Sequence, residues 1–386
     1  MKVALITDGI WPFVVGGMQK HSYYLCKYLT RNKIFVQLYH STRTGIKPDL
    51  TGEFSESELT YLEDFYIPYP GSGIFPGRYI RSSARYSRLI YAEFIKHSGV
   101  DIVYVKGLSG LAFFNAKRRG ALLPPVFLHV HGYEYYQKAA TIKDKIAQLM
   151  LRPVFKKVNK CSDYIFSYGP PISTIIRKHI PNSGDKIIEV PAAIEGAFIS
   201  EQILQACPVR KFVFIGRYER RKGISELFYA VRKLAEKYVF EIHFIGPITR
   251  PNYMKNARYV FHGQVTDSNR IREILRNSEI LVCPSYSEGM PNVILEGMAS
   301  GCAIIATKVG AIPVEVDESN GWLIPPGSAR ALYNSLAVAI TCDGHTLDRM
   351  RTSSVNKVKR HFTWDKIIVQ IVEAFENAIG KYKIKP

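Results

Sequence analysis

Short apolar runs alternate with longer amphipathic segments along most of this chain, and this alternation constrains its fold more than any other feature. In the first half, runs rich in Val, Ile and Phe predict strands at Lys2–Thr7, Ile34–Tyr39, Asp101–Val105, Val126–Val130 and Tyr164–Ser167. The segments between them predict helices over 18–31, 81–96, 142–160 and 172–179. Strands that alternate with helices form parallel sheets covered on both faces. The sequence therefore predicts an α/β fold.

The same rhythm restarts in the second half, which indicates a second domain. Further strands are expected at Lys211–Ile215, Glu241–Ile245, Tyr259–His262, Ile280–Cys283 and Ala303–Thr307, with helices over 224–237, 267–277 and 293–300. Neither periodicity holds over 190–209, and the chain is helical after Arg330. We predict two doubly wound domains, 1–200 and 201–362, and a C-terminal helix at 363–386 that packs back toward the first domain. Because ligands bind at the carboxyl ends of parallel strands, we expect the site in the cleft between the domains.

Charge and cysteine usage narrow the possible partners. The formal net charge of +19 predicts attraction to an acidic partner: nucleic acid, an anionic membrane face or a phosphorylated small molecule. The six cysteines are scattered without a C-x-x-C pair, as expected of reduced thiols in a cytoplasmic protein. No signal peptide is recognisable, and no apolar run reaches the ~18 residues that a membrane span requires. We expect a cytoplasmic protein that is at most peripheral on the inner face of the cell membrane.

The most informative stretch is CPSYSEGMPNVILEGMASG, residues 283–301. A strand is expected to end at Cys283, and a helix to begin with Pro291 at its first position. Gly289 lets the backbone approach a ligand, and a helix start attracts phosphate through its N–H groups and dipole. We expect the phosphate to be bound by the backbone at the helix start, formed by Met290, Pro291, Asn292 and Val293. The carboxylates of Glu288 and Glu296 could accept hydrogen bonds from the hydroxyls of a ribose or hexose. Two unrelated surface glutamates would give the same sequence pattern.

Two cations in FIGRYERRKGISEL, residues 214–227, strengthen this interpretation. Arg217 and Lys222 follow a predicted strand, so they are expected at the same carboxyl edge as the helix start. A guanidinium and an ammonium facing a helix N-terminus make a diphosphate site. Arg220 and Arg221 are expected to be exposed loop charges.

Together these motifs resemble a known family. GR-x(4)-KG at 216–223, followed by EGMPNVILE at 288–296, resembles the retaining glycosyltransferases of GT-B architecture, and most closely their family four. That family carries a glutamate, seven residues and a second glutamate, which Glu288 and Glu296 match. The resemblance continues through 297–313 and 321–328 and extends more weakly to the first domain. It implies two Rossmann-like domains that face each other across a cleft and transfer a sugar from a nucleoside-diphosphate donor.

In the first domain the resemblance assigns two features to this cleft. One is the Gly16–Gly17 pair between the first strand and its helix, where a plain tight turn is the alternative. The other is His131, which matches the family's sugar-contacting histidine, whereas His129 suits a core position. Glu134 is a further polar candidate, for which a plain surface role is the alternative. No G-x-G-x-x-G is present, which argues against a dinucleotide oxidoreductase.

Three positions depart from the family pattern. Pro191–Ala193 replaces a frequent Pro-Asn-Gly, Glu315 is displaced by one residue, and a frequent histidine near Lys106 is missing. None of these removes Arg217, Lys222, Glu288 or Glu296. These departures affect the prediction of the donor and the acceptor more than the prediction of the reaction class.

The resemblance implies a role for each site residue. Arg217, Lys222 and the amides near 290–293 would stabilise the departing diphosphate. Glu288 would hold sugar hydroxyls, Glu296 the ribose, and His131 the hexose. No two aspartates lie two positions apart, so the D-x-D that other glycosyltransferases use for a metal is missing. We therefore expect metal-independent transfer without a cofactor.

The excess of positive charge suggests a use beyond the donor. Basic residues gather at 78–88, at 117–119, and at 143–160, where they mix with apolar residues. A basic amphipathic helix binds anionic lipid, although an ordinary surface helix shows the same pattern.

We predict a retaining hexosyltransferase that uses a glycan or lipid-linked acceptor in cell-surface polysaccharide or lipopolysaccharide synthesis. The alternatives are a nucleotide-sugar epimerase of similar fold, an inactive sugar-binding relative, and a nucleic-acid-binding protein. Because no nucleic-acid-binding motif is recognisable, we expect no nucleic-acid partner.

Overall fold

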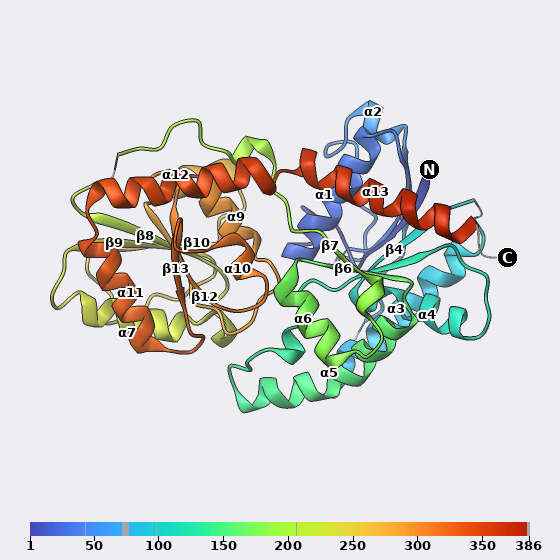
Figure 1. Ribbon diagram of the computed structural model, residues 1–386, viewed down its shortest axis with the longest axis horizontal. Helices are drawn as coiled ribbons and strands as arrows, with labels where there is room; N and C mark the ends of the chain where they lie inside the picture. Colours follow the sequence, from blue (N-terminus) through green and yellow to red (C-terminus); the bar gives the residue numbers. More distant parts are fainter. Residues whose placement is uncertain (43, 72–76, 98, 206, 384–386) are drawn as a thin grey trace. The chain divides into compact units, whose positions relative to one another are not determined.

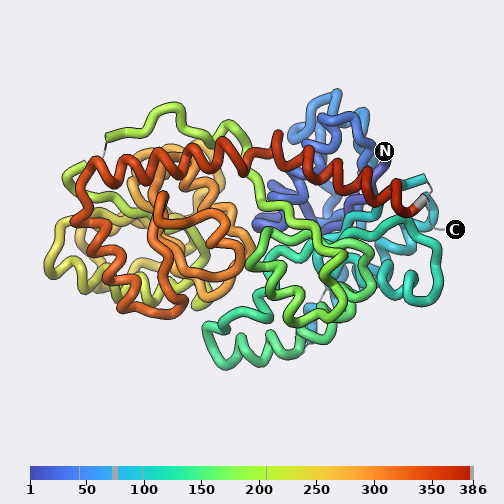
Figure 2. Tube along the Cα trace, in the orientation of Figure 1, coloured from blue at the N-terminus to red at the C-terminus, as the bar shows by residue number. Residues whose placement is uncertain are grey.

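The computed structural model describes residues 1–383 except 43, 72–76, 98 and 206 (Figure 1). Position 206 of the predicted junction and the last three residues of the predicted C-terminal helix lie outside this description. The chain divides into two compact units. The first unit holds residues 1–131, 149–192 and 364–386, and the second holds 132–148 and 193–363. Figure 2 follows the chain through each unit.

A seven-stranded, wholly parallel sheet forms the centre of the first unit, in the order β3-β2-β1-β4-β5-β6-β7. The strands are β1 Lys2–Ile6, β2 Phe35–His40, β3 Leu62–Tyr66, β4 Ile102–Lys106, β5 Val126–His129, β6 Tyr164–Ser167 and β7 Ile187–Glu189. The helices are α1 Gly17–Arg31, α2 Glu56–Leu59, α3 Arg78–Phe94, α4 Leu111–Arg118, α5 Ile142–Cys161, α6 Pro170–His179 and α13 Trp364–Lys383. The first turns of α5 cluster with the second unit. Successive strands extend the sheet to one side of β1 and then to the other, so its switch point lies between β1 and β4.

The second unit repeats this plan with a six-stranded parallel sheet, in the order β10-β9-β8-β11-β12-β13. Its strands are β8 Arg210–Ile215, β9 Phe240–Ile245, β10 Tyr259–Gly263, β11 Ile280–Cys283, β12 Ala303–Thr307 and β13 Gly321–Ile324. Its helices are α7 Ile224–Leu234, α8 Ser268–Arg276, α9 Asn292–Ala299, α10 Ile312–Glu315, α11 Ala329–Thr341 and α12 Gly344–His361. The switch point of this sheet lies between β8 and β11.

Burial explains why most of these strands can be recognised in the sequence as runs of apolar residues. Both faces of a parallel sheet are covered, so a strand such as β12 (AIIAT) is buried at every position. In the second unit, α7 and α11 pack against each other, and α12 packs on α9. Among the described residues, no helix combines the length and the apolar character that crossing a bilayer requires.

Three observed strands are not predicted from the sequence, and each has a physical reason. Strand β3 (LEDFY) carries two carboxylates and is only partly buried at the sheet edge. Strand β7 has three residues, and β13 begins with a glycine. The predicted α/β class and the doubly wound parallel sheets are confirmed, and most predicted strand ends lie within one residue of the observed ones.

Candidate functional site

Two loops meet at the switch point of the second sheet. One follows β8 and contains a short 3-10 turn at Arg220–Lys222, and the other follows β11 and leads into α9. Gly223 lets them touch: it has φ +70°, and a Cβ there would lie 2.1 Å from the Pro284 carbonyl oxygen. The Tyr286 N–H donates to the Arg221 carbonyl oxygen at 2.8 Å. These contacts place residues that are more than 60 positions apart in sequence at one edge of the sheet.

An ion pair between Lys222 and Glu288 forms the centre of this arrangement. The Lys222 Nζ lies 2.6 Å from Glu288 Oε1, and both side chains are largely buried. Burial raises the pKa of Glu288, but the positive charges of Lys222 and Arg221 outweigh burial, so that its pKa is lowered overall. Glu288 is therefore a carboxylate held in its charged form by adjacent cations.

One arginine of this loop differs from its predicted role, whereas Arg220 is exposed as predicted. The prediction that Arg221 is an exposed loop charge is wrong: its Nη1 lies 3.6 Å from Glu288 Oε2 and donates to the Ser287 carbonyl oxygen. Arg220 pairs with Glu226 on α7. Arg217 has a 66% exposed side chain, and its Nε lies 3.1 Å from Glu219. The structure thus brings Lys222 to Glu288 and places the Arg217 guanidinium on Glu219.

The backbone around Glu288 is clamped by two segments that sequence reasoning missed. The Gln137 amide donates to the Glu288 carbonyl oxygen at 2.6 Å and accepts from the Glu288 N–H at 3.2 Å. Gly310, at φ +53°, lies so close that a Cβ would be 2.1 Å from the same carbonyl oxygen. The Ala311 N–H donates to the Gly289 carbonyl oxygen at 2.7 Å. Gly310 lies in the stretch that resembles the family, but no sequence signal points to Gln137.

Helix α9 begins at Asn292, one residue before the predicted range 293–300, and Pro291 is its extended N-cap and not its first helical residue as expected. The first N–H groups of a helix have no intrahelical acceptor, and proline offers no side-chain acceptor to them. The Ile294 N–H donates to the Pro291 carbonyl oxygen at 2.9 Å, and Pro291 has no N–H. The N–H groups of Asn292 and Val293 and the positive end of the helix dipole are therefore what the start of α9 offers beside Gly289. Glu296 lies in the second turn and is buried, with 6% of its surface exposed.

Two further carboxyl groups belong to this neighbourhood. Burial raises the pKa of Glu134, and the nearby charge of Arg221 opposes that shift. Glu315 is fully buried, and neither of its carboxyl oxygens has a hydrogen-bond partner in the described part of the chain. Burial, and next the charge of Glu288, raise the pKa of Glu315 well above its usual value. Glu315 thus favours its neutral form while Glu288 favours its charged form.

The first unit places its predicted residues at the carboxyl edge of its own sheet. Gly16 is the N-cap of α1 and Gly17 its first residue. His129 ends β5 and is buried, as predicted, whereas His131 lies two residues further on and is partly exposed. The two imidazoles stack with their centroids 4.8 Å apart.

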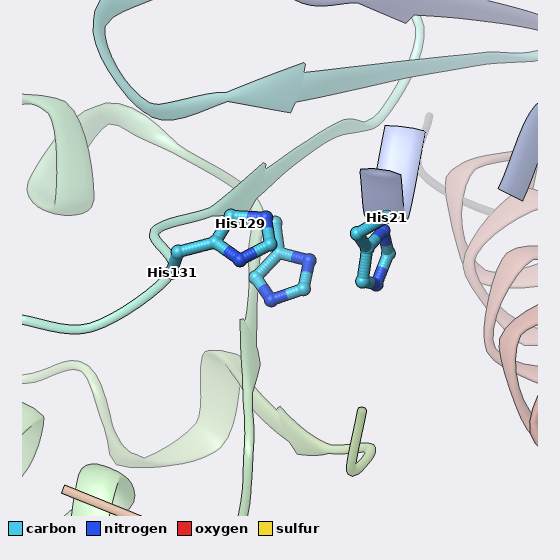
Figure 3. Close-up of side chains that lie close together, drawn as sticks. All are labelled: His21, His129 and His131. Carbon is cyan, nitrogen blue, oxygen red and sulfur yellow. The ribbon is translucent and has the colours of Figure 1, made fainter. Parts of the chain in front are cut away.

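A third histidine, which sequence reasoning missed, completes a cluster. Figure 3 shows His21 of α1 facing the stacked rings of His129 and His131. One ring nitrogen from each histidine lies within 4.8 Å of the other two, a grouping that could hold a metal ion. The Nζ of Lys106 lies within hydrogen-bonding distance of a ring nitrogen of each of the three.

Comparison with known proteins decides the family. The pattern described as "Glycosyltransferase Family 4" matches residues 15–195, and that described as "Glycosyl transferases group 1" matches residues 209–341. The chain belongs to glycosyltransferase family 4. A Bacillus subtilis protein that carries the name "Putative teichuronic acid biosynthesis glycosyltransferase TuaC" is 33% identical over 127 residues. That match covers 33% of this chain and 32% of TuaC, about a third of each protein.

Solved structures confirm the GT-B fold of this family 4 chain. Sucrose-phosphate synthase from Thermosynechococcus elongatus superposes with a TM-score of 0.81 at 20% identity, over 98% of this chain and 99% of that one. HepE from Anabaena, solved in complex with UDP and glucose, superposes with a TM-score of 0.68 at 15% identity. The latter match covers 98% of this chain and all of HepE.

Proposed function

We propose that this family 4 chain transfers a hexose from a nucleoside-diphosphate sugar to a glycan or lipid-linked acceptor, with retention of anomeric configuration. The observation that carries the proposal is the Lys222–Glu288 pair, 2.6 Å apart beside the start of α9, at the switch point of the second sheet. A cation and free helix N–H groups suit a diphosphate, and a carboxylate suits sugar hydroxyls. The complex of HepE with UDP and glucose supports this donor class.

The hard step is breaking the bond between the anomeric carbon and the diphosphate oxygen. Negative charge develops on the leaving diphosphate, and groups that are already oriented stabilise it without reorganising. Lys222 and the first N–H groups of α9 supply this stabilisation. Arg217 joins them in our proposal by exchanging its exposed contact with Glu219 for a phosphate. Arg221, which already lies 3.6 Å from Glu288, adds a further positive charge.

The remaining site residues take the roles that the family resemblance implies. Glu288 accepts hydrogen bonds from the sugar hydroxyls, and Glu296 accepts them from the nucleoside ribose. In the first unit, His131 and the Gly16–Gly17 turn are the proposed contacts of the hexose and of a phosphate or acceptor.

Retention follows from attack on the same face that the leaving group departs from. The bond from the anomeric carbon to the phosphate oxygen breaks, a bond from that carbon to the acceptor oxygen forms, and the acceptor proton moves to the departing phosphate. No carboxylate of the protein acts as the nucleophile in this scheme. Trapping a glycosyl ester on a glutamate or aspartate would overturn it.

The lipid-linked acceptor and a peripheral membrane association draw support from α5. Its exposed apolar residues fall at helical spacing on one stripe: Ile142, Ile146, Leu149 and Met150. Basic residues flank this stripe or continue it toward the end of the helix: Lys143, Lys145, Arg152, Lys156, Lys157 and Lys160. An apolar stripe bordered by cations is the pattern of a helix that lies in an anionic lipid surface. The assignment of TuaC to teichuronic acid synthesis also supports a role in making cell-surface polymers.

The decisive experiment measures release of the nucleoside diphosphate from a panel of nucleotide sugars, with and without extracts of lipid-linked glycans. We expect release that depends on the acceptor and a product that keeps the donor's anomeric configuration. Conversion of the donor to a second nucleotide sugar without acceptor would instead show an epimerase. Turnover of none of the nucleotide sugars, by a protein that also fails to bind them, would overturn the proposal.

A further inference from the structure

A lysine without a carboxylate partner lies inside the first unit. Lys106 is the last residue of β4, and none of its surface is exposed. Its Nζ lies 2.9 Å from His21 Nδ1, 3.0 Å from His129 Nδ1 and 3.4 Å from His131 Nε2. In the described part of the chain, no carboxylate forms an ion pair with it. Three imidazole nitrogens thus converge on one amine.

The hydrogen-bonding capacities of these groups match if the amine carries its charge. An ammonium has three N–H donors and no acceptor, and each neutral imidazole offers one lone pair. Burial lowers the pKa of all four groups, and the charge of Lys106 lowers the pKa of the three histidines further. The rings therefore favour their neutral form, whereas burial opposes the charge of Lys106, which depends on the acceptors around its Nζ. The Tyr104 hydroxyl is a fourth polar neighbour, 3.4 Å from the Lys106 Nζ and 2.6 Å from His129 Nδ1, so it shares the His129 nitrogen with the ammonium. Three ring nitrogens and this hydroxyl oxygen therefore surround the ammonium as acceptors. They also solvate its charge in place of water.

The same three rings form the type of ligand set that binds a transition metal. Their nitrogens lie within 4.8 Å of one another, and neutral imidazole is the commonest protein ligand of such ions. The Nζ of Lys106 lies among them at hydrogen-bond distances of 2.9 to 3.4 Å. A metal ion would sit closer to each ring, at about 2.0–2.1 Å. The ammonium therefore occupies the space that a metal would need.

We propose that Lys106 is the resident cation of this three-histidine site, that it takes the place of a metal ion, and that it fixes the tautomer of His131. Because His131 Nε2 accepts from Lys106, the ring carries its proton on Nδ1. That nitrogen donates to the Tyr168 hydroxyl, 2.7 Å away. Both nitrogens of the partly exposed ring are then engaged, so His131 is held in one orientation at the edge of the first sheet. Lys106 is a positioning residue, and this role does not depend on which sugar the chain transfers.

The first test is metal binding by the purified full chain, followed by the absorption spectrum of added Co²⁺. Wild-type protein is expected to show no Co²⁺ bound by these three rings. Lys106→Ala removes the ammonium and is expected to gain one bound Co²⁺ per chain with a nitrogen-ligand spectrum. The double variant Lys106→Ala/His129→Ala is expected to lose that ion. The matched control is Lys117→Ala, which removes an ammonium paired with Asp163 elsewhere in the first unit and is expected to gain none.

The second test needs no substitution at Lys106 and therefore remains informative if the alanine variant does not fold. In wild-type protein labelled with ¹⁵N-histidine, the ring of His131 is identified by the signals that His131→Gln removes. We expect a neutral ring protonated on Nδ1. A proton on Nε2, a charged ring, or Co²⁺ uptake by wild type equal to that of a folded Lys106→Ala variant would each overturn the proposal.

Discussion

Glu288 and Glu315 show how residues of one type acquire opposite properties within one loop cluster. Glu288 is buried beside Lys222 and Arg221, and these charges lower its pKa despite burial. Glu315 is buried without a hydrogen-bond partner among the described residues, and burial raises its pKa. The difference arises from which loops reach each carboxyl group, and sequence spacing alone does not carry this information.

Removing the Lys222 ammonium tests the proposed role of the cation. Lys222→Met is expected to lower kcat by about 10²–10³-fold, because one pre-oriented donor to the developing charge is lost. Steady-state release of the nucleoside diphosphate measures the change. Lys233→Met is the matched control, because it removes an exposed lysine of α7 that pairs with Glu236, and it should leave kcat unchanged. Equal activity of the two variants would contradict the role of Lys222.

Glu315 predicts a particular dependence of stability on pH. The pKa of Glu315 in the folded state lies above its pKa in the unfolded chain, which is about 4.3. The contribution of Glu315 to stability is therefore fully present below the unfolded-state pKa. It is lost as the pH rises toward the folded-state pKa. The loss amounts to at most about 1.4 kcal/mol per pH unit for one proton. Glu315→Gln carries no such proton, so the variant should gain stability relative to wild type between pH 5 and pH 8 in urea unfolding. Glu236→Gln, at an exposed site, should run parallel to wild type, and a parallel curve for Glu315→Gln would contradict the prediction.

At the scale of elements, the strands were largely predictable and the contacts between loops were not. Strand β12 is buried on both faces and therefore reads as a continuous apolar run, whereas β3 lies at an edge and carries Glu63 and Asp64. Lys222 and Glu288 could be selected because their motifs follow predicted strands. Arg221 and Gln137 could not, because their contacts depend on the turn at Gly223 and on a segment about 150 positions away in the chain.

The close approach of the loop before α10 to the Glu288 turn depends on a missing Cβ. Gly310→Ala places that atom 2.1 Å from the Glu288 carbonyl oxygen at φ +53°. We expect a loss of unfolding free energy of about 1 kcal/mol from the backbone conformation and a further loss of about 1–3 kcal/mol from overpacking. Gly263→Ala is the control, because Gly263 has φ +69° with nothing within 4 Å and should show only the backbone cost. Equal losses in urea unfolding would show that the contact can relax.

Helix α5 carries the prediction about membranes. Wild-type protein should cosediment with vesicles that contain anionic lipid more than with neutral vesicles, because each basic residue near the surface contributes about 1 kcal/mol. Ile146→Glu/Met150→Glu places two carboxylates on the exposed apolar stripe and should abolish most of this binding. Val338→Glu alters an apolar residue on α11 that is 52% exposed and should bind as wild type does. Equal sedimentation of wild type on neutral and anionic vesicles would contradict the role of α5.

At the scale of the whole molecule, each unit carries its own cluster at the switch point of its own sheet. In the second unit, the Lys222–Glu288 pair and the start of α9 are assembled from two loops of one sheet. In the first unit, Lys106 at the end of β4 meets His21 of α1, which follows β1. Repetition of one sheet plan thus yields two chemically different sites. In our proposals, the cluster of the second unit binds a diphosphate, and the cluster of the first unit is filled by the Lys106 ammonium.

Nucleoside diphosphates should therefore stabilise the full chain through the second unit and without a metal. A ligand that binds only the folded form adds about 2.7 kcal/mol at a concentration 100 times its Kd, and the melting temperature rises accordingly. We expect such a shift with at least one nucleoside diphosphate, the same shift in EDTA, and its loss in Lys222→Met. We expect metal independence because, in our proposal, Lys222 and the start of α9 supply the positive charge that a metal would bring to the phosphates. A shift that disappears in EDTA and returns with Mg²⁺ would contradict metal independence while preserving the donor class. A shift that survives Lys222→Met unchanged would place the diphosphate elsewhere.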